Sequence, residues 1–255
     1  MSLRRATSDT EAPGSKVCST SCRLNSRGKF GRLPGASFLP STMSATLVPA
    51  KKFGGNQITS IYGCLENGRD EALTLIALFV GSMWAVFFLS VALPFLHLNE
   101  HGVVPRSLDG LQGILFAPWL HASVGHIAAN TSGLVVLGWL CTWPNIAGFW
   151  RATIGAMLGA GLCAWLFGAP YSVHIGASGL VFGYAGHLVA RGYYTRNLVS
   201  ILVALVVVSS YGLSLLFGVL PIYPDVSWQS HVGGVLGGVL AARAGAGAAN
   251  RVRVR

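Results

Sequence analysis

The chain has 255 residues, of which 52% are hydrophobic and only 10% are charged, and its formal net charge at pH 7 is +10. Soluble domains carry about 25% charged residues, so the composition argues against a soluble protein. Ten of the eighteen Lys and Arg precede Glu71 and four follow Ala242, a placement that membrane orientation explains better than nucleic-acid binding does.

Residues 1–70 are rich in Ser, Arg, Gly and Pro and show no sustained hydrophobic periodicity, which predicts a disordered basic N-terminal tail. The first thirty or so residues contain Arg and Ser with few acids, a faint likeness to a transit peptide. Met43 is an alternative start within this tail. Residues 246–255 are expected to form a second, short basic tail.

Six apolar segments predict an all-α membrane protein with six transmembrane helices in residues 71–245. A span needs about 20 predominantly apolar residues. The expected spans are 72–96, 124–143, 149–167, 178–189 with its flanks, 198–220 and 229–242. Residues 99–120 mix charged and large apolar residues, which predicts an element partly embedded in the membrane between the first two spans.

The distribution of charge predicts the orientation of these spans. An even number of spans places both termini on one side, and that side collects nearly all the Lys and Arg; the loops of the other side contain only Arg106. The positive-inside rule therefore predicts cytoplasmic termini. Ser178 and His231 would then lie at the external ends of the fourth and sixth spans. The plasma membrane is the simplest location, and the sequence leaves the oligomeric state open.

Ser178 lies between glycines, in the string Gly176-Ala177-Ser178-Gly179, at the start of an apolar run. Free backbone N–H groups and the helix dipole at a helix N-terminus favour a developing negative charge, which a nucleophile and its oxyanion require. His126 and Asn130 are four residues apart, so they share one face of the second span. Both can donate hydrogen bonds to an oxyanion; hydrogen bonding between helices is the alternative role.

His231 is the candidate general base for Ser178. Asp225 is the only acid near the sixth span, and it sits in a turn, so we expect a Ser–His dyad rather than a triad. Two glycine stripes, formed by Gly179 with Gly183 and by Gly234 with Gly238, would let the fourth and sixth helices approach closely. The five Cys have no spacing typical of a metal site or a disulfide framework, and no cofactor is expected.

Three stretches together resemble the rhomboid family of intramembrane serine proteases: H-x4-H-x3-N from His121, G-x-S-G around Ser178, and H-x2-G-x3-G from His231. The resemblance covers roughly residues 72–245. It implies a six-helix bundle in the lipid bilayer and an endopeptidase that cleaves transmembrane proteins in or near their spans. It also implies that Phe182 packs on the catalytic histidine, whereas His121 is expected to be structural.

The chain departs from the family in the loop between the first two spans, because Gln112 and Gly113 stand where many rhomboids carry a Trp-Arg pair. Arg106 and Trp119 are the alternatives for anchoring that loop. Ser230 also replaces the usual Ala before the histidine, a change between small residues that should be tolerated. Two further histidines, at 174 and 187, are not expected to be catalytic. A proteolytically silent relative, acting in membrane binding or quality control, is the alternative function. A transporter would need charges at mid-membrane or inverted repeats, and neither is visible.

Overall fold

The structure is a computed structural model that describes the backbone of residues 55–253 and the side chains of residues 70–248. Most of the predicted N-terminal tail therefore lies outside the described residues. The long helices are α1 (Gly55–Ala92), α3 (Val124–Cys141), α4 (Ile146–Phe167), α5 (Ser178–Thr195), α6 (Leu198–Gly218) and α7 (Trp228–Arg253). No named strand occurs between residues 55 and 253, which agrees with the predicted all-α class.

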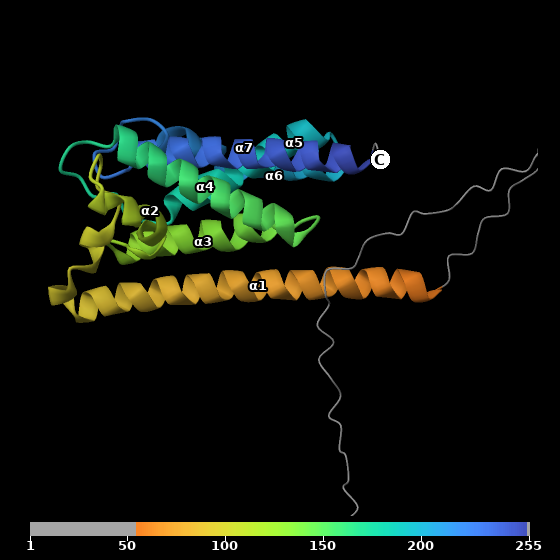
Figure 1. Cartoon of the computed structure of the whole chain (residues 1–255), viewed down its shortest axis with the longest axis horizontal. Helices are drawn as coiled ribbons and strands as arrows, with labels where there is room; N and C mark the ends of the chain where they lie inside the picture. The colour runs from red at the N-terminus through yellow and green to blue at the C-terminus, as the bar shows by residue number, and fades with distance from the viewer. Residues whose placement is uncertain (1–54, 254–255) are drawn as a thin grey trace, which may run out of the picture. The chain divides into compact units, whose positions relative to one another are not determined.

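The six long helices lie at the six places where spans are predicted (Figure 1). Within the described residues, α1, α3, α4 and α6 are long and apolar enough to cross a membrane. The other two, α5 and α7, contain many glycines. Twelve of the eighteen residues of α5 are buried, against two of the twenty-one in α6. Because other helices surround α5, its sequence does not need the hydropathy of a lipid-facing span. The chain folds as an all-α membrane bundle.

Two helices extend beyond the predicted domain limits. Helix α1 begins at Gly55, inside the segment predicted as a tail, and α7 continues to Arg253, past the predicted end of the bundle at residue 245. Proline is the strongest helix breaker, and the sequence has none between Pro49 and Pro94 or after Pro224. The apolar segments fix where each helix lies in the bundle, but nothing in the flanking sequence stops the helix there.

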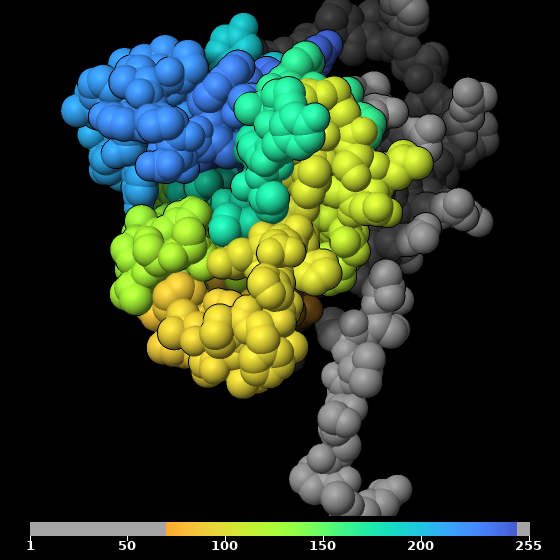
Figure 2. Space-filling view, turned by 90° about the vertical axis from the view of Figure 1, so that its left-hand side faces the viewer, coloured from red at the N-terminus to blue at the C-terminus, as the bar shows by residue number. Residues whose placement is uncertain are grey.

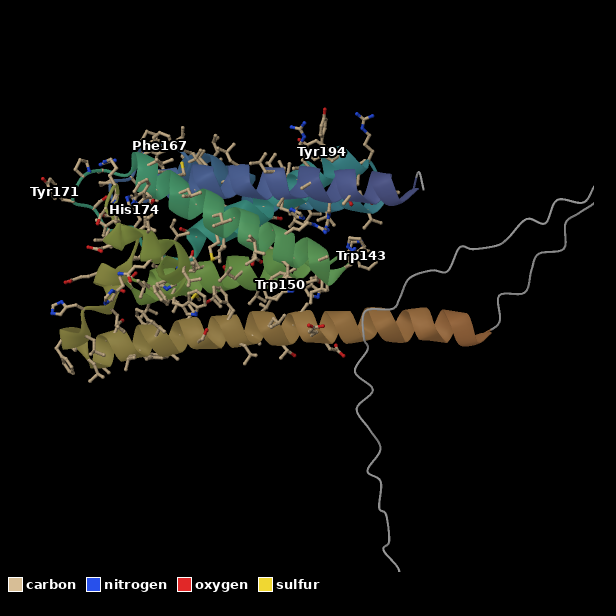
Figure 3. The ribbon with its side chains drawn as sticks, in the orientation of Figure 1. Trp143, Trp150, Phe167, Tyr171, His174 and Tyr194 are labelled. Carbon is tan, nitrogen blue, oxygen red and sulfur yellow. The ribbon has the colours of Figure 1, made fainter. Side chains whose placement is uncertain are left out.

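The outer surface of the bundle is apolar, as expected for a membrane protein. Large hydrophobic side chains are exposed on the lipid-facing helices, among them Phe88 on α1, Leu158 on α4 and Leu205 on α6. Aromatic residues lie toward both ends of the bundle: Trp143 and Tyr194 at one end, Tyr171 at the other (Figure 3). Exposed apolar surface and terminal aromatic residues are the pattern that a bilayer imposes.

The segment between α1 and α3 forms short helical turns instead of a span, in agreement with the prediction for residues 99–120. These turns are η1 (Pro94–Leu96), η2 (Leu98–His101), η3 (Asp109–Gln112), α2 (Gly113–Phe116) and η4 (Ala117–Trp119). Both candidate anchors hold this segment. The Arg106 guanidinium donates to the carbonyl oxygens of Leu166 at 3.2 Å and Gly168 at 2.9 Å, at the C-terminus of α4. The Trp119 indole N–H donates to Ser82 Oγ on α1 at 2.9 Å.

Candidate active site

Ser178 is the first residue of α5, and the turn before it depends on Gly176. Gly176 has φ +112°, a conformation that residues with a Cβ rarely adopt. A Cβ at this position would also lie 2.6 Å from the His126 ring and 3.4 Å from Asn130 Nδ2. Gly176 thus allows both the turn that presents Ser178 and the close approach of these two polar side chains from α3.

His231 forms a hydrogen bond with Ser178, with Nε2 2.8 Å from Oγ. Its other ring nitrogen, Nδ1, lies 2.8 Å from the backbone oxygen of Gly218. A carbonyl can only accept, so Nδ1 carries the proton of the neutral ring and Nε2 accepts the hydrogen of Ser178. The Gly218 carbonyl is available because it is among the last of α6, where the helix leaves its carbonyls without intrahelical partners.

An aromatic ring and a glycine hold the His231 imidazole in this orientation. The Phe182 ring stacks on it, with ring centroids 3.9 Å apart and an interplanar angle of 9°. On the α6 side, a Cβ at Gly218 would lie 2.3 Å from Phe182 Cζ and 3.2 Å from His231 Nδ1. Only glycine leaves room for the ring pair and for the hydrogen bond to its own carbonyl.

The two glycine stripes face each other across α5 and α7. A Cβ at Gly234 would lie 2.2 Å from the backbone oxygen of Gly179, and one at Gly238 would lie 2.0 Å from that of Gly183. Helix α7 makes similarly close contacts on α4, where a Cβ at Gly159 would lie 2.2 Å from the oxygen of Gly233. Small residues bring these backbones together, and this closeness brings the Ser178 and His231 side chains within hydrogen-bonding distance.

His121, His126 and Asn130 form one cluster beside the Ser178 turn. Asn130 Nδ2 lies 2.9 Å from His121 Nε2, and the two histidine rings pack edge to face with centroids 4.9 Å apart. His121 lies before α3, outside the helix, and it is buried. Burial lowers its pKa to about 4, assisted by the charge of His126. A neutral His121 ring can therefore accept the Asn130 amide.

Ser178, His231 and His126 line a cavity of about 830 Å³. Its walls come from the start of α3 and from the loops before α5 and α7. Figure 2 looks onto this end of the bundle, where the segments between α1 and α3, α4 and α5, and α6 and α7 gather. Asp225 also lines the cavity. Ser178 and His231 thus lie together at the wall of one open cavity.

His187 and His174, which are not expected to be catalytic, have different surroundings. The ring of His187 lies between α5 and α7, with Nδ1 3.3 Å from the Gly238 oxygen, and it does not line the cavity. His174 does line the cavity and hydrogen-bonds Ser227 and Ser172. Sequence patterns missed Gly218 and Ser227. The first acts through its main chain and the second through a contact between distant loops, so neither belongs to a motif.

The fold and this arrangement define an all-helical, multi-pass membrane protein in which a serine and a neutral histidine are hydrogen-bonded beside an open cavity. The model of the rhomboid domain matches residues 109–247, more than half of the chain, so the protein belongs to the rhomboid family.

Mycobacterial proteins also resemble part of this chain. An uncharacterized protein of Mycobacterium tuberculosis is 42% identical over 154 residues, which are 57% of this chain and 63% of that protein. An uncharacterized protein of Mycobacterium bovis matches equally well, and one of Mycobacterium leprae is 37% identical over 153 residues, 57% of this chain and 60% of that protein. The match thus spans less than two thirds of these relatives.

Proposed function

We propose that this protein is an intramembrane serine endopeptidase that cleaves transmembrane proteins in or near their spans with a Ser178–His231 dyad. The observation that carries the proposal is the 2.8 Å hydrogen bond between Ser178 Oγ and His231 Nε2, formed at the wall of a cavity of about 830 Å³. A serine is a weak nucleophile unless a base is in contact with its hydroxyl. Neutral His231 with its proton on Nδ1 can act as this base, because its Nε2 is then able to take the Ser178 proton.

The proposed reaction has two halves. In the first, Ser178 Oγ bonds to the scissile carbonyl carbon while its proton moves to His231 Nε2, and the proton then passes to the leaving amine as the C–N bond breaks. In the second, water gives a proton to His231 and attacks the acyl carbon, and Ser178 leaves and regains its proton. The Gly218 carbonyl accepts a hydrogen bond from Nδ1–H of His231 throughout, and this proton is not transferred.

The negative charge of the tetrahedral intermediate needs hydrogen-bond donors. The backbone N–H of Ser178 at the start of α5 and the side chains of His126 and Asn130 are the proposed donors. Both side chains approach Gly176, two residues before the nucleophile. His121 supports the arrangement by holding the Asn130 amide at 2.9 Å.

The proposed orientation has six spans with both termini in the cytoplasm, and the plasma membrane is the proposed location. Basic residues support it: Arg151 lies near the start of α4, and Arg191 and Arg196 lie at the end of α5 away from Ser178. These arginines therefore lie at the end of the bundle opposite the cavity. The positive-inside rule assigns that end to the cytoplasm and the cavity to the external side.

Labelling with a fluorophosphonate in lipid, together with cleavage of a single-span substrate, tests this function. Wild-type protein should be labelled at Ser178 only. Ser178→Ala should abolish labelling and cleavage, and His231→Ala should do nearly the same. Ser132→Ala is a matched control, because its hydroxyl is exposed and bonds only its own helix at Ala129. Wild-type protein that neither labels nor cleaves would favour the alternative, a silent membrane-binding relative.

A further inference from the structure

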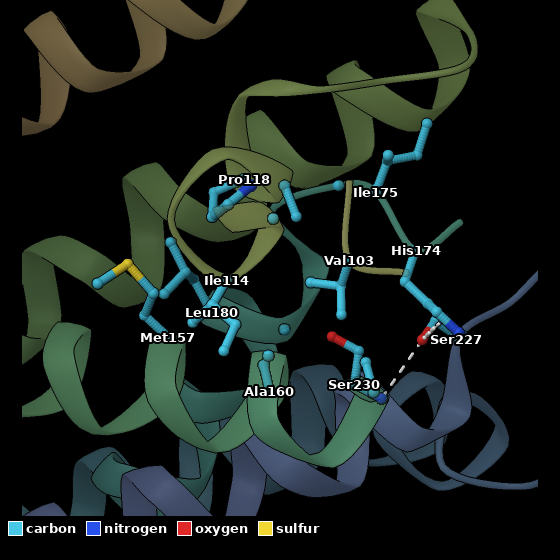
Figure 4. Close-up of a pocket in the computed structure, with 16 residues that line it drawn as sticks. Val103, Ile114, Pro118, Met157, Ala160, His174, Ile175, Leu180, Ser227 and Ser230 are labelled. Carbon is cyan, nitrogen blue, oxygen red and sulfur yellow. Dashed lines mark hydrogen bonds between the residues drawn. The ribbon is translucent and has the colours of Figure 1, made fainter. Parts of the chain in front are cut away.

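His174 joins three loop segments at the end of the bundle that holds the cavity. Its backbone N–H and carbonyl each pair with Val103, in the segment between α1 and α3, at 2.9 Å. Its ring Nδ1 lies 2.6 Å from Ser227 Oγ, at the residue before α7. Its Nε2 lies 3.0 Å from Ser172 Oγ, in its own loop. Figure 4 shows Val103, His174 and Ser227 together at this junction.

The neighbouring hydrogen bonds fix the direction of each of these contacts. Ser172 donates its hydroxyl hydrogen to the Ala169 carbonyl at 2.7 Å, so its oxygen accepts from Nε2–H of His174. Nδ1 of the neutral ring then accepts the hydroxyl hydrogen of Ser227. The Ser227 oxygen in turn accepts the backbone N–H of Ser230 at 3.4 Å, as an N-cap of α7. Each polar hydrogen in this series of hydrogen bonds thus has one acceptor. Burial lowers the pKa of His174, which favours the neutral ring that the series requires.

The hydrogen bond between His174 and Ser227 connects the same two parts of the protein as the proposed dyad does. His174 is four residues before Ser178, and Ser227 is four residues before His231. The approaches to α5 and α7 are therefore joined twice, once by the hydrogen bond between Ser178 and His231 and once by the hydrogen bond between His174 and Ser227. The backbone N–H of His231 also bonds the Ser227 carbonyl at 3.1 Å, so a shift of Ser227 is transmitted to the base.

We propose that His174 is a positioning residue for proteolysis: through Ser227 it fixes the first turn of α7 against the loop that leads to Ser178, and so aligns His231 on the nucleophile. This inference rests on the proposed function. The small space beneath the contact, about 20 Å³ and bordered by His174, Ser227 and Ser230, leaves room for these side chains to shift when the bond is lost. A misplacement of about 1 Å can lower a rate about a hundredfold.

The test measures the rate constant of fluorophosphonate labelling at Ser178, per folded protein, in lipid. His174→Ala and Ser227→Ala should each lower it about tenfold or more, and the double variant should be no slower than the slower single variant, because both remove one contact. Ser227→Thr keeps the hydroxyl and should restore the rate. Cleavage should show a fall in kcat with KM nearly unchanged. Ser132→Ala, which removes an exposed hydroxyl that bonds the Ala129 carbonyl of its own helix, is the control and should label at close to the wild-type rate.

Other outcomes would overturn the inference. The inference would be wrong if folded His174→Ala and Ser227→Ala were labelled at the wild-type rate. It would also be wrong if the fold-losses in labelling rate of the two single variants multiplied in the double variant. If His174→Ala does not fold, the comparison of Ser227→Ala with Ser227→Thr decides, and equal rates for these two would contradict the proposal. If wild-type protein is not labelled at all, the proposed function itself fails, which distinguishes that failure from a failure of the His174 contact alone.

Discussion

The Nδ1 nitrogen of His231 lies 2.8 Å from the main-chain oxygen of Gly218, the last residue of α6. In a serine protease triad an acidic side chain holds this nitrogen. Here a main-chain group makes that contact, so the chain needs no carboxylate to fix the tautomer of the proposed base. Asp225, the acid nearest to α7 in the sequence, is exposed in the cavity wall.

Replacement of Asp225 by Asn should therefore leave the chemistry nearly intact. Loss of a triad aspartate lowers kcat by about 10⁴-fold, whereas we expect the Asp225→Asn labelling rate to stay within about threefold of wild type, because the Gly218 carbonyl remains. The measurement is the rate of fluorophosphonate labelling. A loss of several hundredfold in folded protein would show that Asp225 is the third member.

Crowding the ring pair on the α6 side should impair the base. A methyl group at Gly218 would lie 2.3 Å from the Phe182 ring, so Gly218→Ala should displace both rings and lower labelling strongly. Phe182→Ala should also slow labelling, because His231 loses its stacking partner. Gly212→Ala in the same helix is the control: its added carbon would meet only Val208, at an ordinary 3.6 Å. Equal labelling in all three variants would refute a positioning role for Phe182.

The contact between α5 and α7 should not tolerate a methyl group. Gly234→Ala would place a carbon 2.2 Å from the Gly179 oxygen, and because a backbone atom cannot turn away, the helices must separate. Overpacking of this kind destabilises by about 1–3 kcal/mol or more, and labelling should fall with it. Gly81→Ala on α1 meets nothing within 4 Å and should not destabilise. The thermal unfolding midpoint in detergent and the labelling rate check both variants; similar values for the two would refute the close-packing argument.

Acid should destabilise the protein in part through His121. Its pKa falls from the usual 6.5 to about 4 on folding, mainly through burial. Between these two pH values the unfolded chain binds more protons at this residue than the folded protein does. The contribution of His121 to the free energy of unfolding is therefore fully present above pH 6.5 and is lost as the pH falls toward 4. The unfolding midpoint should therefore drop over this interval in wild type, and less steeply in His121→Gln. A replacement of exposed His101 by Gln is the control, and identical slopes in all three proteins would contradict the assignment.

The predicted topology can be tested with reporter fusions. Arg196 follows α5 and Asp225 precedes α7, so the length of α6 separates them. We expect a reporter fused after Arg196 to be cytoplasmic and one fused after Asp225 to be external. A common location for both fusions would mean that α6 does not cross the membrane, and the six-span prediction would be wrong.

Sequence patterns located the helices and the proposed dyad because both depend on local signals. Hydropathy indicated the spans, and glycines beside Ser178 and after His231 marked two helices that approach closely. The limits of α1 and α7 could not be predicted from hydropathy, since a helix continues beyond its apolar part until a residue breaks it. The contacts of Arg106, Gly218 and Ser227 join segments far apart in the chain, and two of them involve main-chain oxygens, which the residue type does not reveal.

The Gly218 contact has a consequence for how the proposed site coexists with lipid. An ionised side chain at membrane depth is expensive, and a carboxylate behind the base would carry its charge permanently. A serine, a neutral imidazole and a peptide carbonyl carry none. In the resting protein the proposed dyad is therefore uncharged, and charges form in it only while a peptide bond is being broken.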